Sequence, residues 1–164
     1  MERFSVRHMY KAMQGKFQKV SWRKLVSNNH GLPKWIFILR LEIQDRLATK
    51  ERLARWESLQ TKYAHSQLLH WQGIQRTKKD WREELKWIEK VAKGKSRGAA
   101  ICRMVLAAAV YHIWQERNNV IFQKKRRSTN VILRLIIQEI HVRAKMFPRL
   151  DRCMIALNWY PDIV

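Results

Sequence analysis

The chain has 164 residues, 46% of them hydrophobic, which is enough for one domain with a core, or for one domain with an attached arm. It carries 34 Lys and Arg against 13 Asp and Glu, a formal net charge of +21, and only 5 Gly and 3 Pro, which disfavours a turn-rich all-β fold. Two cysteines, Cys102 and Cys153, exclude a disulfide framework and a Cys-rich metal site, so we expect a reducing intracellular compartment.

The first half of the chain is predicted to form short helices. Apolar residues at helical spacing indicate a helix over 6–13, capped by Ser5, one or two turns capped by Ser21, and longer helices over 34–45 and 49–63. Their core-facing residues are Val6, Met9, Tyr10 and Met13; Trp22, Leu25 and Val26; Trp35, Ile38, Leu39 and Leu41; and Leu53, Trp56, Leu59 and Tyr63. Residues 28–33 read as a loop, and the weaker pattern of 64–71 fits either a continued helix or an irregular connector.

The second half contains the strongest helical signals. Thr77 and Asp80 form a capping pair before a helix with Trp81, Leu85, Ile88 and Val91 on one face. Ser96 is the predicted cap of a long helix over 99–124. Ser128 or Thr129 is the predicted cap of a last helix over 131–146, which Pro148 ends.

These elements predict an all-α fold, an irregular bundle of about six or seven helices that ends in a long helical hairpin. We expect a helical region over 1–92, a basic linker over 93–98 and the hairpin over 99–147. Residues 148–164 are expected to be a poorly ordered tail, from which Leu157, Trp159 and Tyr160 could dock on the body.

The charge and the first 41 residues bear on partners and compartment. A large excess of one charge sign repels itself in the compact state, and a polyanion relieves that repulsion; nucleic acid is the commonest such partner. The first 41 residues hold one acid, Glu2, a bias typical of organellar transit peptides, although the whole chain is basic. The longest apolar stretch, 104–111, is too short to cross a bilayer, so no membrane partner is expected. Nucleus or cytoplasm is the expected location, with the mitochondrion as the alternative.

Several segments, in order along the chain, resemble a known family. They are FSVRHMY at 4–10, WRKLV at 22–26, LPKWIFIL at 32–39 and QDRLATKERL at 44–53, followed by GKS at 94–96, VYHIWQERNN at 110–119 and IF at 121–122. Together they resemble the zinc-binding region that closes many plant non-LTR retrotransposon reverse transcriptases, and the helix after it. The resemblance covers roughly 4–145 and implies a retroelement origin. It implies no activity, because the catalytic aspartates of the parent polyprotein lie in a part that is absent here.

The chain departs from this family at its zinc site. The resemblance implies a Cys-x-x-Cys pair, then a His and a Cys, just after the segment matching 52–56. Residues 58–71 instead contain His65 and His70 and no cysteine. Structural zinc needs about four ligands, and Glu57 and Cys102 are poor substitutes for the missing thiolates. We therefore expect a shortened region without metal or cofactor.

No catalytic centre is predicted. Glu83, Glu84 and Glu89 are expected to be salt-bridged surface rather than paired catalytic carboxylates. Cys102 and His112 lie ten residues apart on one helix, about 15 Å by helical rise, so His112 is expected to be a core histidine. The GKS of 94–96 lacks the upstream glycine of a phosphate loop. The chain is therefore expected not to be an enzyme and to have no small-molecule substrate.

Cationic clusters beside aromatic residues predict a nucleic-acid interface. Bases stack on exposed aromatic rings while Lys and Arg pair with phosphates, which suits single strands. The predicted binding residues are Lys124, Lys125, Arg126 and Arg127; Arg76, Lys78, Lys79 and Arg82 with Trp81, beside Trp71; and Lys93, Lys95 and Arg97. The alternatives are a solvated loop or nuclear import signal for 124–127, and core positions for the tryptophans.

The sequence thus favours a non-catalytic, retrotransposon-derived protein that binds single-stranded RNA or DNA without strong sequence preference. The alternative is a protein-interaction or self-associating regulatory module, for which an organelle is one of the expected locations. Helices over 99–122 and 131–146 are apolar over much of their circumference, so they could pair within one chain or seal a dimer.

Overall fold

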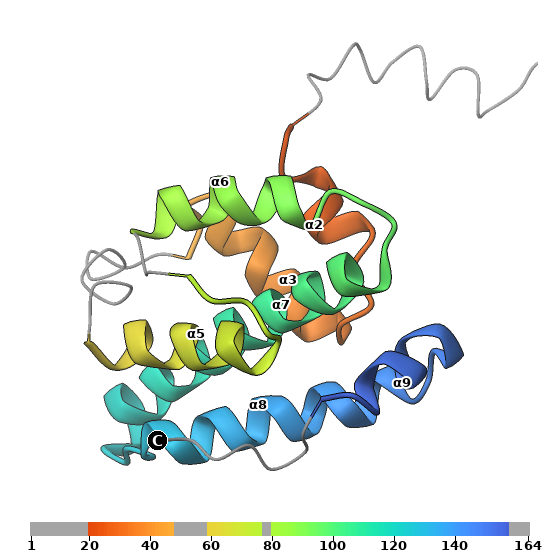
Figure 1. The fold of residues 1–164 in the computed structure, drawn as a ribbon. Coiled ribbons are helices and arrows are strands. Elements are labelled where there is room, and N and C mark those ends of the chain that lie inside the picture. Colours follow the sequence, from red (N-terminus) through yellow and green to blue (C-terminus); the bar gives the residue numbers. More distant parts are fainter. Residues whose placement is uncertain (1–19, 48–58, 77–79, 158–164) are drawn as a thin grey trace, which may run out of the picture.

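A computed structural model describes residues 20–47, 59–76 and 80–157, and in these ranges the chain is all-α, without strands (Figure 1). The described elements are α2 (Arg23–Ser27), α3 (Pro33–Ile43), α5 (Leu59–Trp71), α6 (Trp81–Val91), α7 (Arg97–Asn118), the π-helical turn η1 (Asn119–Gln123), α8 (Thr129–Ala144) and α9 (Pro148–Met154). The all-α prediction is confirmed. The helix expected over 6–13, residues 49–58 of the next one, and the docking of Trp159 and Tyr160 lie outside the described residues.

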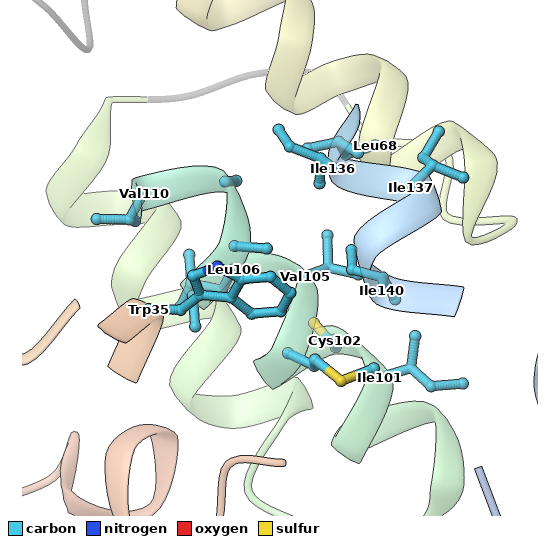
Figure 2. Close-up of a cluster of buried hydrophobic side chains, with 14 of the residues drawn as sticks. Trp35, Leu68, Ile101, Cys102, Val105, Leu106, Val110, Ile136, Ile137 and Ile140 are labelled. Carbon is cyan, nitrogen blue, oxygen red and sulfur yellow. The ribbon is translucent and has the colours of Figure 1, made fainter. Parts of the chain in front are cut away.

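Helix α7 forms the centre of the molecule. It contacts α3, α5, α6, α8 and α9, and residues 99–110 are buried without interruption. Trp35 of α3, Leu68 of α5 and Ile136 of α8 point toward the apolar side chains of α7 (Figure 2). A helix that is apolar on all sides is stable only when neighbours cover its whole circumference, which explains the central position of α7. No helix among the described residues is long and apolar enough to span a bilayer.

The C-terminal hairpin begins with the predicted caps. The Ser96 side chain accepts a hydrogen bond from the Ala99 N–H at 3.1 Å, and Ser128 accepts one from Val131 at 3.4 Å. These caps place the helix starts at Arg97 and Thr129, two residues before the predicted starts. The end of α7 widens into the π-helical turn η1, and Lys124 then reverses the chain in the left-handed conformation with φ 54°. Non-glycine residues adopt this conformation rarely, so the turn is fixed by its surroundings.

Residues after Pro148 differ from the prediction. Pro148 occupies the first turn of α9, where its missing N–H is not needed. Leu150 and Met154, four residues apart on one face, are both buried against the body, and Leu157 packs on the core. The expected poorly ordered tail is therefore wrong for residues 148–154, because a short apolar stripe docks them.

Smaller corrections concern α2 and α6. Trp22, and not Ser21, precedes the first residue of α2, and no side chain caps that helix. Val91 is 45% exposed and not part of the core face of α6, because the buried positions of that helix are Glu84 and Ile88. Residues 64–71 continue a helix, α5, and do not form an irregular connector.

Candidate nucleic-acid interface

The loop after η1 carries the compact cationic cluster predicted from the sequence. Lys124, Lys125 and Arg126 are exposed, whereas Arg127 is partly buried. The Nε of Arg127 donates to Oε2 of Glu116 at 2.7 Å, and the Arg127 backbone N–H donates to Oε1 of the same carboxylate at 2.6 Å. Two bonds to one carboxylate fix both the guanidinium and the backbone. Arg127 therefore holds the loop against α7, and the three exposed cations project from a positioned loop.

An exposed aromatic side chain lies next to these cations. Phe122, in η1, is 79% exposed, and Ile121 beside it is 40% exposed. Isolated apolar side chains on a surface are common, but a large ring this open gains nothing from the core. The sequence prediction missed Phe122, although an aromatic residue two positions before a run of four cations was the available signal. The loop thus combines a free π-face with positive charge.

The second predicted cluster, at the start of α6, is partly used within the fold. The Nε of Arg76 donates to Oε2 of Glu84 at 3.3 Å, and its guanidinium lies 4.4 Å from the ring centroid of Trp87. Trp81 packs against the core with part of its surface exposed, and Arg82 is exposed. The remaining predicted members, Lys78 and Lys79, lie outside the described residues. Trp71 is a core residue, 9% exposed.

Glu84 is not the surface residue expected from the sequence. It is 4% exposed, because its position on α6 turns it inward, and it forms a salt bridge with Arg76. Glu83 is exposed and Glu89 partly so, which places the three glutamates in different surroundings. They do not form a paired carboxylate site.

The imidazole of His65, on α5, is buried beside Glu84 and Cys102. Its Nε2 lies 4.0 Å from Oε1 of Glu84, and burial, with Arg76 second, lowers the pKa of His65 to about 4. Burial likewise raises the pKa of Cys102 to about 11, so the thiol stays protonated. Both line a cavity of about 10 Å³, which holds at most one water molecule. These groups have no room for a substrate.

The histidines considered as metal ligands do not converge. His65 is 8% exposed and faces the core, whereas His70, five residues along α5, is exposed. Within the described ranges no three His, Cys, Asp or Glu side chains form a group able to hold a metal.

His112 is a core histidine, as predicted. It is 1% exposed, and its Nε2 lies 3.0 Å from Oε2 of Glu139 on α8. Burial lowers the pKa of His112, while the Glu139 carboxylate raises it, and burial is the larger effect. The neutral ring donates from Nε2 to Glu139 and so ties α7 to α8.

A groove of about 670 Å³ is lined by residues 20–28, in and around α2, and by residues 89–93 at the end of α6. Arg23 and Lys24 line it from α2, and Lys90 and Lys93 line it from α6 and the following loop. Of these, only Lys93 was predicted as a binding residue. The other two predicted cations near it, Lys95 in the loop and Arg97 at the start of α7, are exposed outside the groove.

The predicted cations do not form one patch. Lys93 lies in the loop that leads into α7, and Phe122 lies in η1, which follows the last residue of α7. Because α7 has 22 residues, its two ends lie about 33 Å apart.

Comparison with known proteins identifies one part of the chain. The family model described as zinc-binding in reverse transcriptase matches residues 4–64. This segment is therefore related to retrotransposon reverse transcriptases, and it includes α2, α3 and the first residues of α5. The match covers less than half of the chain, and α6 to α9 lie beyond it. No curated protein and no solved structure matches the chain.

Proposed function

We propose that this is a non-catalytic, retrotransposon-derived protein that binds single-stranded RNA or DNA without strong sequence preference. The observation that carries the proposal is the exposed ring of Phe122 beside Lys124, Lys125 and Arg126. The reverse-transcriptase-related segment supports an origin in an element that works on nucleic acid.

The chemistry of this loop suits a single strand. Stacking of one base on an aromatic ring contributes about 1 to 3 kcal/mol and does not depend strongly on the base. The adjacent cations neutralise phosphates and release counterions, which makes binding depend steeply on salt. A duplex keeps its bases stacked inside, so it would use only the cations. We therefore expect single strands to bind more tightly than duplexes of the same length.

The non-catalytic part of the proposal is supported by the surroundings of the reactive side chains. His65, Cys102 and His112 are each buried, and the cavity beside the first two is the size of one water molecule. A nucleophile or general base must reach its substrate, and these three do not reach the surface.

The test is fluorescence anisotropy with a labelled single-stranded RNA over a salt series. Phe122→Leu removes the π-face but keeps an apolar side chain, so we expect a loss of affinity of about fivefold or more. Ile155→Ala is the matched control, because Ile155 is 81% exposed in the C-terminal region and has no aromatic ring. An unchanged affinity in Phe122→Leu, or no binding at physiological salt, would contradict the proposal.

A protein-interaction or self-associating role is the second candidate. Val131, Val142 and Met146 share one face of α8 and its end, and they are 52%, 60% and 67% exposed. Light scattering that shows a defined oligomer, without RNA affinity at physiological salt, would favour this role. A tagged protein would locate the chain in nucleus, cytoplasm or mitochondrion, which implies different partners.

A further inference from the structure

We propose that the groove between α2 and the end of α6 is a second contact for the same strand, and that it binds the phosphate backbone. This inference rests on the proposed function, and it adds a site that lies at the opposite end of α7 from Phe122. Together the two regions would make a bipartite interface, in which a base stacks on Phe122 at one end and the cations of the groove bind phosphates at the other.

The groove has the charge that a phosphodiester needs. Arg23, Lys24, Lys90 and Lys93 line it from two sides, and they are all exposed. Of the described residues that line it, one is a carboxylate, Glu89. The other lining side chains include Ser21, which can donate a hydrogen bond to a phosphate oxygen. Four cations in one concave surface focus a positive potential more strongly than the same charges spread over a convex one.

A buried arginine fixes the two walls of the groove relative to each other. The Nε of Arg103, on α7, donates to the Asn28 carbonyl at the end of α2 at 3.0 Å. Its Nη1 donates to the carbonyl of Ala92, directly after α6, and to that of Gly94 at 3.0 Å. Arg103 is 4% exposed, so water does not compete for these bonds. One guanidinium therefore joins both walls, and the cations are positioned before a ligand arrives.

The α2 wall is also held by the backbone of Arg103. The Asn29 side-chain amide donates to the Leu25 carbonyl within α2 at 2.9 Å and to the Arg103 carbonyl at 2.7 Å. A preformed site loses less conformational entropy on binding than a flexible one. The buried charge of Arg103 also adds to the positive potential behind the groove.

The separation of the two regions predicts how long a strand must be. The length of α7, about 33 Å, corresponds to at most about ten nucleotides at 3.4 Å, the spacing of a stacked strand, and to fewer nucleotides of an extended strand. A 4-nucleotide RNA reaches one region, whereas a 20-nucleotide RNA can occupy both. Affinity should therefore rise sharply between these lengths, beyond the increase that the larger number of binding registers gives.

The experiment measures anisotropy of 4- and 20-nucleotide RNAs with the full chain and the variant Lys90→Gln/Lys93→Gln. We expect the variant to lose about five- to tenfold in affinity for the 20-mer and less than twofold for the 4-mer. Its salt slope should fall by about 1.4, since each lost phosphate contact on a single strand contributes about 0.7. The matched control, Arg134→Gln/Arg149→Gln, removes two exposed cations of α8 and α9 and should change either affinity less than twofold.

A second variant is expected to raise the affinity instead of lowering it. Glu89→Gln removes the carboxylate of the groove and should raise affinity for the 20-mer roughly two- to fivefold, which damage to the fold would not do. If the groove variants and the control behave alike, or Glu89→Gln weakens binding, the groove is not a binding site. Loss of binding in Phe122→Leu alone would then leave the proposed function standing, whereas groove effects without a Phe122 effect would locate binding in the groove only.

Discussion

The buried His65 predicts that acid destabilises the fold in a defined pH range. Burial lowers the pKa of His65 in the folded state to about 4, against an ordinary value of 6.5. The Glu84 carboxylate at 4.0 Å would favour the protonated ring, but its charge is already balanced by Arg76 at 3.3 Å, so burial dominates. Between pH 6.5 and pH 4, His65 is therefore protonated in the unfolded chain and neutral in the folded chain. Stability is therefore complete above pH 6.5 and falls as the pH drops toward 4.

The size of this effect follows from the two pKa values. Between pH 7.5 and pH 4.5, His65 alone should remove about 2.5 kcal/mol from the free energy of unfolding. Other groups titrate in the same range, including His112 and His30, whose pKa values burial also lowers. The informative quantity is therefore the difference between the wild-type chain and His65→Gln, which has a similar size and does not titrate.

Urea unfolding followed by tryptophan fluorescence at several pH values measures that difference. The wild-type profile should fall more steeply than that of His65→Gln, by about 2.5 kcal/mol over this range. An NMR titration of the His65 ring gives its pKa directly. Parallel profiles, or a wild-type chain that gains stability on acidification relative to the variant, would show that Glu84 and not burial controls the ring.

Three further changes test the packing of the fold by thermal or urea unfolding. Asp80→Ala removes the cap that accepts from the Glu83 N–H at 2.8 Å and should destabilise by about 1 kcal/mol, whereas Asp80→Ser should retain most of that stability. Gly31→Ala should destabilise by about 1 to 3 kcal/mol, because the new Cβ would lie 3.0 Å from Asn29 Oδ1 and 3.1 Å from the Trp35 ring; an unchanged stability would show that both side chains can move. Arg103→Met should destabilise by about 2 to 4 kcal/mol by leaving carbonyls without their donor, and Arg103→Lys should recover part of this loss.

The elements that the sequence predicts well are those whose signals are local. Ser96 was predicted as a cap, and Ser128 as one of two candidates with Thr129, because a cap acts within three residues. The apolar run of α7 predicted a buried helix because few other structures satisfy so continuous a pattern. By contrast, α9 was missed, since two apolar residues on a seven-residue helix acquire meaning only when a surface is present for them to pack against.

The candidate site could be predicted only in part, because tertiary contacts decide which cations stay exposed. Lys124 to Arg127 look equivalent in sequence, yet Glu116, eleven residues before Arg127, selects that one as a structural clamp. Arg23 and Lys93 come from distant parts of the chain, and a pattern along the sequence cannot place them in one groove. Arg103 of α7 brings them together by bonding to carbonyls of both walls. Its position in an apolar run of the sequence did not indicate this role.

The acids of the chain are too few to offset its positive charge, wherever they lie. Among the described residues, Glu84 pairs with Arg76 and Glu116 pairs with Arg127, so each of these carboxylates neutralises one cation and no more. The chain holds 34 Lys and Arg against 13 Asp and Glu, which leaves an excess of 21 cations even if every acid pairs with one. Like charges repel one another in the compact state, and an anionic partner that lies along the surface relieves this repulsion.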